Sequence, residues 1–252
     1  MSANNPDRGD AAKPQRMVIV GGSSGIGRAT AEAAVAAGLG VMLVARDASK
    51  LARVADELGG VPWASVDMTD QSAVAKWTET LDAFDHLVIT AASSSHGRFA
   101  DMPLSDVRRM FDGKFFGPYA VAQACLPRII AGGSITFFSG VLSRRPGLNC
   151  SGLGAVNSAV EGLTRALALE LGPRIRVNCI SPGMVRTEVY AGMPDDARQA
   201  MFRSTGESLP LGRVGEAREI AHAVLFAATN TFLTGQVLDV DGGHMIRQYA
   251  TR

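Results

Sequence analysis

The chain has few cysteines and no long apolar run. Its 252 residues include three cysteines, Cys125, Cys150 and Cys179, with no CxxC pair and no histidine close to any of them. This usage argues against a disulfide framework and indicates reduced, buried thiols in a cytoplasmic protein. No apolar stretch reaches the roughly 18 residues that a membrane span needs. We therefore expect a soluble protein that does not insert into membranes.

An excess of charge is also missing. Lys and Arg number 25 against 24 Asp and Glu, which leaves a net charge of +1. Such a balance gives no strong field toward nucleic acid or an anionic membrane, so the expected partner is a small molecule. Residues 1–15 are polar and lack the apolar segment of a signal peptide, which predicts a disordered tail. One domain is then expected over residues 16–252.

Short apolar runs alternate with longer segments of helical period. Strands are predicted at 17–20, 41–45, 61–66, 86–90, 134–139, 176–181 and 236–240, and helices at 25–37, 48–58, 70–82, 104–130, 152–171 and 216–228. The strands are apolar almost throughout, which is typical of a parallel sheet covered by helices on both faces. The pattern predicts a single-domain α/β fold. The longest irregular segment is predicted at about 183–215 and is interpreted as a mobile lid over a site.

A glycine-rich turn follows the first predicted strand. In "GGSSGIGRATA", Gly21, Gly25 and Gly27 have G-x-x-x-G-x-G spacing between a strand and a helix. Glycines there let the backbone turn tightly and approach a pyrophosphate, which the helix N-terminus stabilises. The alternative is a plain glycine-rich turn, but the strand–turn–helix context favours dinucleotide binding.

The end of the second predicted strand favours one dinucleotide over another. A protein that prefers NAD usually has a carboxylate here for the ribose hydroxyls, whereas this chain has Ala45 and Arg46. The Arg46 guanidinium can hold a 2′-phosphate, which predicts NADP(H); alternatively, Arg46 is only a solvated residue at a strand exit. In "VDMTD", Asp67 and Met68 follow the third strand, where an adenine amino group and ring can be held.

With these motifs the chain resembles the short-chain dehydrogenase/reductase family over about residues 16–246. The matching segments are "GGSSGIG" for TGxxxGIG, "DHLVITAA" for DxLVNNAG and "IRVNCISPGMVRT" for RVNxxxPGxxxT, followed by "LTGQVLDVDGGH". The resemblance implies a doubly wound, Rossmann-type parallel sheet of seven strands in the order 3-2-1-4-5-6-7. It also implies hydride transfer between a nicotinamide and an alcohol or carbonyl, commonly in a homotetramer.

The resemblance further implies which residues bind the cofactor. The phosphates are expected at the glycine turn, at Gly21, Ser23, Ser24, Gly25 and Ile26. The adenine is expected after the third strand, at Asp67 and Met68, and the ribose after the fourth, at Ala91. The nicotinamide is expected beside the Pro-Gly turn, at Pro182, Gly183, Val185 and Thr187. Two departures from the family motifs are mild, with Val20 in place of Thr and "ITAA" in place of Asn-Asn-Ala-Gly.

A more severe departure concerns the family's catalytic residues. Members carry Tyr-x-x-x-Lys at the start of the long helix, a Ser upstream and an Asn on the preceding helix, and the Tyr supplies a proton to the carbonyl. Alignment of "AVEGLTRALALEL" places Leu153 at the Tyr, Asn157 at the Lys, Gly140 at the Ser and Lys114 at the Asn. No shift of register restores the pair, because no tyrosine or lysine lies near the start of this helix.

One amide and one amine persist with exchanged positions, Asn157 for the family's Lys and Lys114 for its Asn. We interpret this as a rebuilt site in which Lys114 is the catalytic candidate and Asn157 contacts the ribose and accepts a hydrogen bond from Lys114. Partial burial without a carboxylate partner is expected to lower the pKa of Lys114. The alternative is drift, with Lys114 reaching solvent or pairing with Asp112. Ser139, one residue before the lost Ser position, is a second catalytic candidate.

The remaining polar candidates are weaker. Arg144 and Arg145 are interpreted as loop surface, and His96 as a proton relay near the cofactor edge. His86, His222 and His244 are interpreted as structural histidines. Glu161 and Glu170 are interpreted as solvated or interface residues. No spacing of His, Cys or Asp suggests a metal site.

Three functions remain open at this stage. The first is an NADP(H)-dependent reductase with a substituted active site, acting on a small carbonyl or an imine or iminium. The second is an NADP-binding scaffold or sensor without turnover, and the third is a non-redox lyase or cyclase. An oligomer, a homotetramer or homodimer, is expected through the helices at 104–130 and 152–171, which carry more apolar residues than one face can use.

Overall fold

The computed structural model describes residues 14–90 and 95–246. The main sheet contains β1 (Arg16–Val20), β2 (Gly40–Ala45), β3 (Trp63–Ser65), β4 (Phe84–Ile89), β5 (Ile129–Phe138), β6 (Arg176–Pro182) and β9 (Val237–Val240), and a small second sheet pairs β7 (Val185–Arg186) with β8 (Gly215–Glu216). The α-helices are α1 (Gly25–Ala36), α2 (Ala48–Glu57), α3 (Gln71–Glu79), α4 (Leu104–Phe111), α5 (Gly117–Cys125), α6 (Ser151–Leu171), α7 (Asp195–Glu207) and α8 (Ala217–Thr229).

The seven strands of the main sheet are parallel and follow the order β3-β2-β1-β4-β5-β6-β9. Since β9 is the last strand of this sheet along the chain, the predicted order 3-2-1-4-5-6-7 is confirmed. Parallel pairing brings the carboxyl ends of all seven strands to one edge. Strand order reverses between β1 and β4, and ligands of doubly wound folds bind at such a point.

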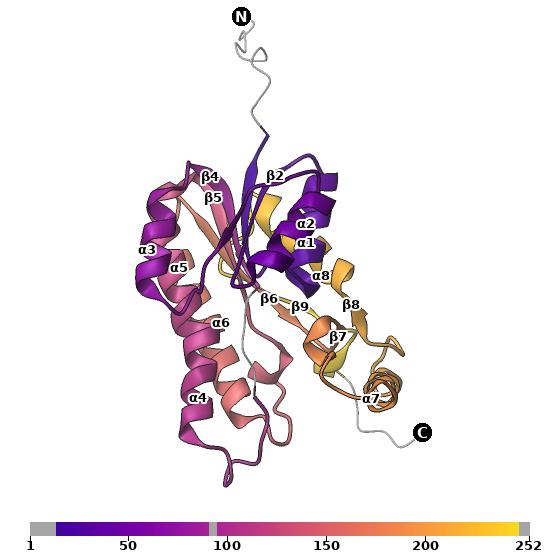
Figure 1. Cartoon of the computed structure of the whole chain (residues 1–252). Helices are drawn as coiled ribbons and strands as arrows, with labels where there is room; N and C mark the ends of the chain where they lie inside the picture. The colour runs from indigo at the N-terminus through magenta and orange to yellow at the C-terminus, as the bar shows by residue number, and fades with distance from the viewer. Residues whose placement is uncertain (1–13, 91–94, 247–252) are drawn as a thin grey trace, which may run out of the picture.

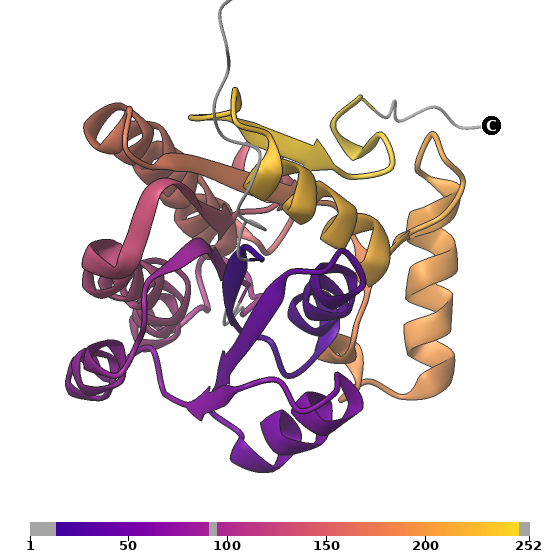
Figure 2. The same ribbon diagram turned by 90° about the horizontal axis from the view of Figure 1, so that it is seen from above.

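Helices cover both faces of the sheet, with α1, α2 and α8 on one side and α3, α5 and α6 on the other (Figures 1 and 2). Alternate side chains of β1 enter the two layers, because successive residues of a strand point to opposite faces. Met17 and Ile19 belong to the core under α1 and α8, whereas Val18 and Val20 belong to the core under α5 and α6. The prediction of a doubly wound α/β fold is therefore confirmed.

The single helix predicted over 104–130 is wrong in detail. The segment contains α4, a π-helical turn η1 (Asp112–Phe116), α5 and a 3-10 turn η2 (Leu126–Arg128), and β5 begins at Ile129. Pro118 lies in the first turn of α5 and Pro127 in η2, and proline suits the first turn of a helix but not its interior. The π turn carries Lys114.

The irregular segment predicted at 183–215 is also wrong, since it holds β7, a 3-10 turn η4 (Glu188–Tyr190), α7 and β8. Helix α7 follows Pro194, and its first turn carries Asp195 and Asp196, which stabilise a helix N-terminus. Phe202 anchors α7: it is buried and meets the Tyr190 ring edge-on with 5.4 Å between centroids. In the described part of the chain, no helix combines the length and apolarity that a membrane crossing needs.

Candidate active site

The turn between β1 and α1 has the geometry of an anion cradle. Gly21 has φ +95° and donates its N–H to the Val44 carbonyl at 2.7 Å. A Cβ at Gly27 would lie 2.1 Å from the Gly21 carbonyl oxygen, so only glycine permits this close approach. Ser24 precedes α1 without a side-chain cap bond, and the first turn carries no acidic residue. The N–H groups at the start of α1 therefore remain available for an anionic ligand.

The predicted phosphate and nicotinamide segments lie together at this turn. Ser23 lies within the turn and Ile26 in the first turn of α1. Gly25 has φ +52°, and a Cβ added there would lie 3.4 Å from the Cβ of Thr187. Strand β6 ends at Pro182, and the segment that follows it brings Thr187 to the glycine turn.

Close packing fixes the course of the chain after Pro182. A Cβ at Gly183 would lie 2.9 Å from the backbone of Asp241, which follows β9. Val185 is buried in the core between the sheet and α8. Both residues therefore hold the segment that carries Thr187 against the glycine turn.

Arg46 and Asp67 lie near each other beyond β2 and β3. Arg46 is exposed directly after β2, and its carbonyl accepts a hydrogen bond from Ser65 at 2.9 Å. Hydrogen bonds from the Thr69 backbone and side chain lower the pKa of Asp67, and the charge of Arg46 contributes. Met68 is buried in the core. Ala91, predicted at the ribose, lies outside the described residues.

Lys114 is buried. Its side chain is 8% exposed, and its ammonium donates a hydrogen bond to the Ser139 carbonyl at 3.2 Å. Burial lowers the pKa of Lys114 to about 8, and the nearby Cys179 opposes this slightly. The alternative in which Lys114 reaches solvent is therefore wrong, and no ion pair joins it to Asp112 within the described residues.

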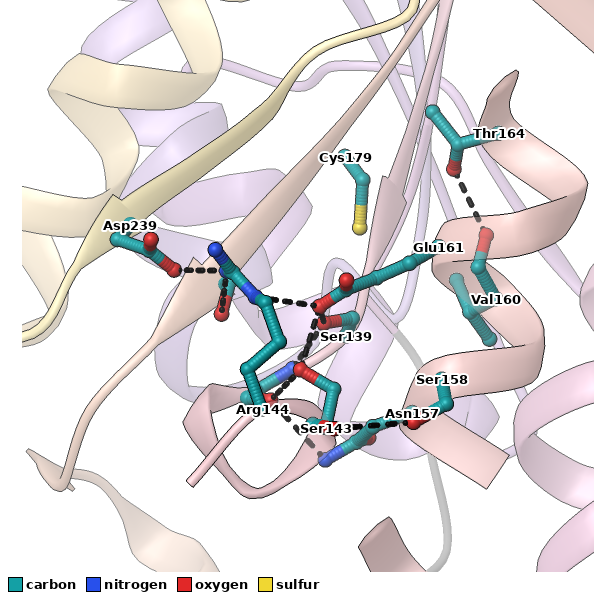
Figure 3. A network of polar contacts seen from close by, with 12 residues as sticks. Ser139, Ser143, Arg144, Asn157, Ser158, Val160, Glu161, Thr164, Cys179 and Asp239 are labelled. Atoms are coloured by element: carbon teal, nitrogen blue, oxygen red, sulfur yellow. Dashed lines mark hydrogen bonds and ion pairs between the residues drawn. The ribbon is translucent and has the colours of Figure 1, made fainter. Parts of the chain in front are cut away.

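Glu161 is the main difference between the predicted and the observed site. Instead of being solvated, it is 4% exposed and faces the end of β5 from α6 (Figure 3). Its Oε1 accepts hydrogen bonds from Ser139 Oγ at 2.9 Å and Ser143 Oγ at 2.5 Å. Ser139 Oγ also accepts the Gly140 N–H at 2.5 Å. The Ser139 hydroxyl is thus held by Glu161, which does not support its predicted contact with a substrate oxygen.

Arg144 and Arg145 are more than loop surface. Arg144 Nε lies 3.5 Å from Glu161 Oε1, and a terminal nitrogen of Arg144 forms an ion pair with Asp239 of β9 (Figure 3). Arg145 donates to the His244 carbonyl at 2.6 Å. Both arginines therefore connect the loop after β5 to the C-terminal segment of the fold.

Asn157 lies beside Gly140. Its Nδ2 lies 3.4 Å from the Gly140 carbonyl oxygen, and its buried Oδ1 has no hydrogen-bond partner among residues 14–90 and 95–246. A Cβ at Gly140 would lie 3.1 Å from Asn157 Nδ2, so the glycine leaves room for the amide. Among the described residues, the Lys114 ammonium donates to the Ser139 carbonyl, and the predicted hydrogen bond from Lys114 to Asn157 is not formed.

The comparisons with known proteins decide the family. A family model described as enoyl-(acyl carrier protein) reductase matches residues 20–245. Galactitol 2-dehydrogenase (L-tagatose-forming) of Cereibacter sphaeroides is 34% identical over 244 residues, 90% of this chain and 94% of that protein. An uncharacterized short-chain type dehydrogenase/reductase of Sinorhizobium fredii is 32% identical over 252 residues, 93% of this chain and 98% of that protein. The chain belongs to the short-chain dehydrogenase/reductase family.

Short-chain dehydrogenases/reductases are also its relatives in structure. A small-chain dehydrogenase solved in complex with NADPH is 38% identical, with a TM-score of 0.80, and the match covers 92% of this chain and 98% of that one. The fold of this family binds a nicotinamide cofactor.

Two observations show that the residues of this short-chain dehydrogenase/reductase fit such a cofactor. Gly27 packs so closely on Gly21 that a Cβ would lie 2.1 Å from its carbonyl oxygen, which makes the turn tight at an uncapped helix N-terminus. The buried Asn157 Oδ1 is an acceptor that no described residue satisfies, which suits a ligand hydroxyl.

The other predicted residues are spread over the structure. His96 is exposed, and His86 is buried in β4, where its Nδ1 lies 2.9 Å from Ser134 Oγ. A groove of about 660 Å³ lies between α1, residues 186–191 and α7. It includes Gly25 and Thr187 but neither Lys114 nor Asn157. Among the described residues, no group of three or more His, Cys, Asp or Glu could hold a metal ion.

Proposed function

We propose that this short-chain dehydrogenase/reductase is an NADP(H)-dependent oxidoreductase with a substituted active site that reduces a small carbonyl or an imine or iminium. The observation that carries the proposal is Lys114. A buried ammonium beside Gly140 costs free energy, and its lowered pKa suits proton transfer near neutral pH.

Arg46 supports the choice of NADP(H). It is exposed at the end of β2 and close enough to Asp67 to affect the pKa of that carboxyl group. When bound, the nicotinamide supplies the hydride. The glycine turn, Thr187 and Asn157 would hold the cofactor, and Arg46 would pair with its 2′-phosphate. The NADPH complex of a 38% identical small-chain dehydrogenase agrees with this assignment.

The chain's own residues limit the chemistry. Leu153 cannot give a proton, and the Ser139 hydroxyl is occupied by Glu161. A carbonyl substrate would therefore take its proton from Lys114 Nζ or from water ordered near it. An iminium substrate already carries its positive charge and requires no such proton.

A second function, an NADP-binding scaffold or sensor without turnover, is favoured by one observation. The Ser139 hydroxyl donates its hydrogen bond to Glu161, and Gly140, at the family's Ser position, has no side chain. Neither position therefore offers a hydroxyl to a substrate. In this alternative, Lys114 and Asn157 serve only to bind the cofactor.

Turnover separates these functions. The protein is incubated anaerobically with NADPH and a panel of ketones, cyclic imines and enones, and absorbance is followed at 340 nm. Once a substrate is found, Lys114→Met is compared with Lys76→Met, which changes an exposed lysine of α3. We expect kcat of Lys114→Met to fall at least about a hundredfold with little change in NADPH affinity. If Lys114→Met weakens NADPH binding and leaves kcat unchanged, Lys114 only binds the cofactor. If the wild type oxidises no NADPH with any compound of the panel, the scaffold or sensor function is favoured.

We also propose a homodimer or homotetramer built from α5 and α6. Large apolar or aromatic side chains are exposed on and beside these helices, with Phe116 at 57%, Tyr119 at 41% and Leu169 at 87%. Light scattering at micromolar concentration should give a multiple of 26.4 kDa. A monomer would refute the assembly. The three cysteines are free thiols, which suits the predicted cytoplasmic location.

A further inference from the structure

Glu161 has a buried position that the proposed chemistry does not use. Within the part of the chain that the structure describes, Glu161 and Lys114 are the only buried residues among the lysines, arginines, aspartates and glutamates. Both are bound to Ser139, Lys114 through the carbonyl and Glu161 through the hydroxyl. A buried carboxylate is costly unless it is paired and hydrogen-bonded. Glu161 meets this condition through two serine hydroxyls and Arg144.

The groups bound to Glu161 also hold the backbone of Gly140. The Gly140 N–H donates to Ser139 Oγ at 2.5 Å, and the Gly140 carbonyl accepts from the Ser143 N–H at 3.0 Å. Ser143 Oγ lies 2.9 Å from the same carbonyl and 2.5 Å from Glu161 Oε1. Arg144 extends the network to Asp239 of β9. Glu161 thus connects α6, the end of β5 and the loop 140–144.

The Gly140 carbonyl in turn determines which end of the Asn157 amide faces it. A carbonyl oxygen accepts hydrogen bonds and cannot donate one, so the Asn157 amide faces it with Nδ2, at 3.4 Å. The acceptor end, Oδ1, has no partner within the part of the chain that the structure describes, although the residue is only 2% exposed. An Asn157 amide held in this orientation presents an acceptor, which selects a ligand group that donates a hydrogen bond, such as a hydroxyl.

We propose that Glu161 is a positioning residue that fixes the Gly140 carbonyl through Ser139 and Ser143, and thereby orients Asn157 to accept a hydrogen bond from a hydroxyl of the dinucleotide. The inference rests on the proposed function, because NADPH is the ligand. Glu161 touches neither cofactor nor substrate in this account. Its effect passes through the loop and the asparagine amide.

The test is a double-mutant cycle on NADPH affinity, measured by titration of nicotinamide fluorescence. Glu161→Leu and Asn157→Leu are each expected to weaken NADPH binding about tenfold, which is the value of one good hydrogen bond. If Glu161 acts through Asn157, the double variant also loses about tenfold and not a hundredfold. Glu161→Gln keeps an acceptor for both serine hydroxyls and should restore most of the affinity. Glu170→Leu, an exposed position of the same helix, is the matched control and should bind as the wild type does.

The outcomes separate the two proposals. A wild type that does not bind NADPH overturns the proposed function and this inference with it. Two other outcomes, with a wild type that binds NADPH, overturn the positioning role alone. One is a folded Glu161→Leu variant with the affinity of the wild type. The other is a double variant whose loss of affinity is the product of the two single losses. If Glu161→Leu does not fold, Ser143→Ala takes its place in the cycle, since it removes the hydroxyl between Glu161 and the Gly140 carbonyl.

Discussion

Replacement of Lys114 by methionine should stabilise this protein at neutral pH. Methionine has a similar length and no charge, so the change removes the ammonium and leaves most of the packing in place. Lys114 is 8% exposed, and its hydrogen bond to the Ser139 carbonyl, 3.2 Å long, is not an ion pair. In the unfolded chain the same ammonium is fully hydrated, so folding carries its desolvation cost.

The lowered pKa gives the size of this cost. A pKa lowered from 10.5 to about 8 corresponds to about 3 kcal/mol, since one pKa unit is about 1.36 kcal/mol. Loss of the hydrogen bond to Ser139 offsets about 1 kcal/mol, which leaves a gain of about 2 kcal/mol for Lys114→Met. For a chain of this length, the gain corresponds to a rise in Tm of about 5 °C.

The effect has a defined pH dependence. Between pH 8 and 10.5 the unfolded chain binds more protons than the folded one, so wild-type stability gains from rising pH in this window. The advantage of Lys114→Met should therefore be full below pH 8. Because about 3 kcal/mol of desolvation cost disappears from the wild type over this window, the wild type should be the more stable protein by about 1 kcal/mol at pH 10.5. Thermal unfolding by circular dichroism from pH 7 to 10.5, with Lys76→Met as control, measures it. A Lys114→Met protein less stable than wild type at pH 7, or a constant difference across the range, would refute the reasoning.

Three further predictions concern the cofactor turn and the sheet. Calorimetry should show that NADPH binds about ten- to a hundredfold more tightly than NADH, since a charge-assisted contact with Arg46 contributes about 1.5–3 kcal/mol. Arg46→Ala should lose this preference. Equal affinities of the wild type for the two dinucleotides would contradict the prediction. Gly27→Ala should abolish NADPH binding, because its Cβ would lie 2.1 Å from the Gly21 carbonyl, whereas Gly162→Ala, with open space around it, should bind normally. Burial lowers the pKa of His86 from 6.5 to about 4, so the unfolded chain takes up a proton at higher pH than the folded chain does. The free energy of unfolding should therefore fall by up to about 3 kcal/mol as pH drops from 6.5 to 4. Urea titrations measure this fall, and a His86→Leu variant that shows the same fall would contradict the prediction.

The sheet was predictable because its strands are nearly continuous apolar runs. Strand β1 is predicted at 17–20 and found at Arg16–Val20, and β2 is predicted at 41–45 and found at Gly40–Ala45. Because β2 and the buried part of β1, residues 17–20, carry no polar side chain, the limits of these two strands are readable from composition. The strand order, by contrast, came from the family resemblance.

Helix α7 was missed because its apolar pattern is weak. Its sequence "DDARQAMFRSTGE" buries only Phe202 and Gly206. The start signal was present, since Pro194 precedes Asp195 and Asp196. The π turn at Lys114 could not be read from periodicity, because a single inserted residue shifts the phase of a helix without changing its composition.

The role of Glu161 was missed for a different reason. Its partners Ser139, Ser143 and Arg144 lie 17 to 22 residues earlier in the chain, and only the packing of α6 against the end of β5 brings them together. One signal was available in the helix itself. Glu161 follows Asn157 by four residues and precedes Thr164 by three, so all three lie on the stripe that faces the core.

The charges around Ser139 bear on whether the proposed substituted site is a product of drift. Lys114, Glu161, Arg144 and Asp239 together carry no net charge, and Lys114 and Glu161 bind the same residue, Ser139. Buried ionic groups are weak sources of stability, and apolar replacements of similar volume are often neutral or stabilising. Under drift, Lys114→Met should improve stability at no functional cost. Under the proposed function with a carbonyl substrate, the same substitution improves stability and lowers kcat at least about a hundredfold. The pairing of these two measurements on one variant, rather than either alone, distinguishes a rebuilt active site from an abandoned one.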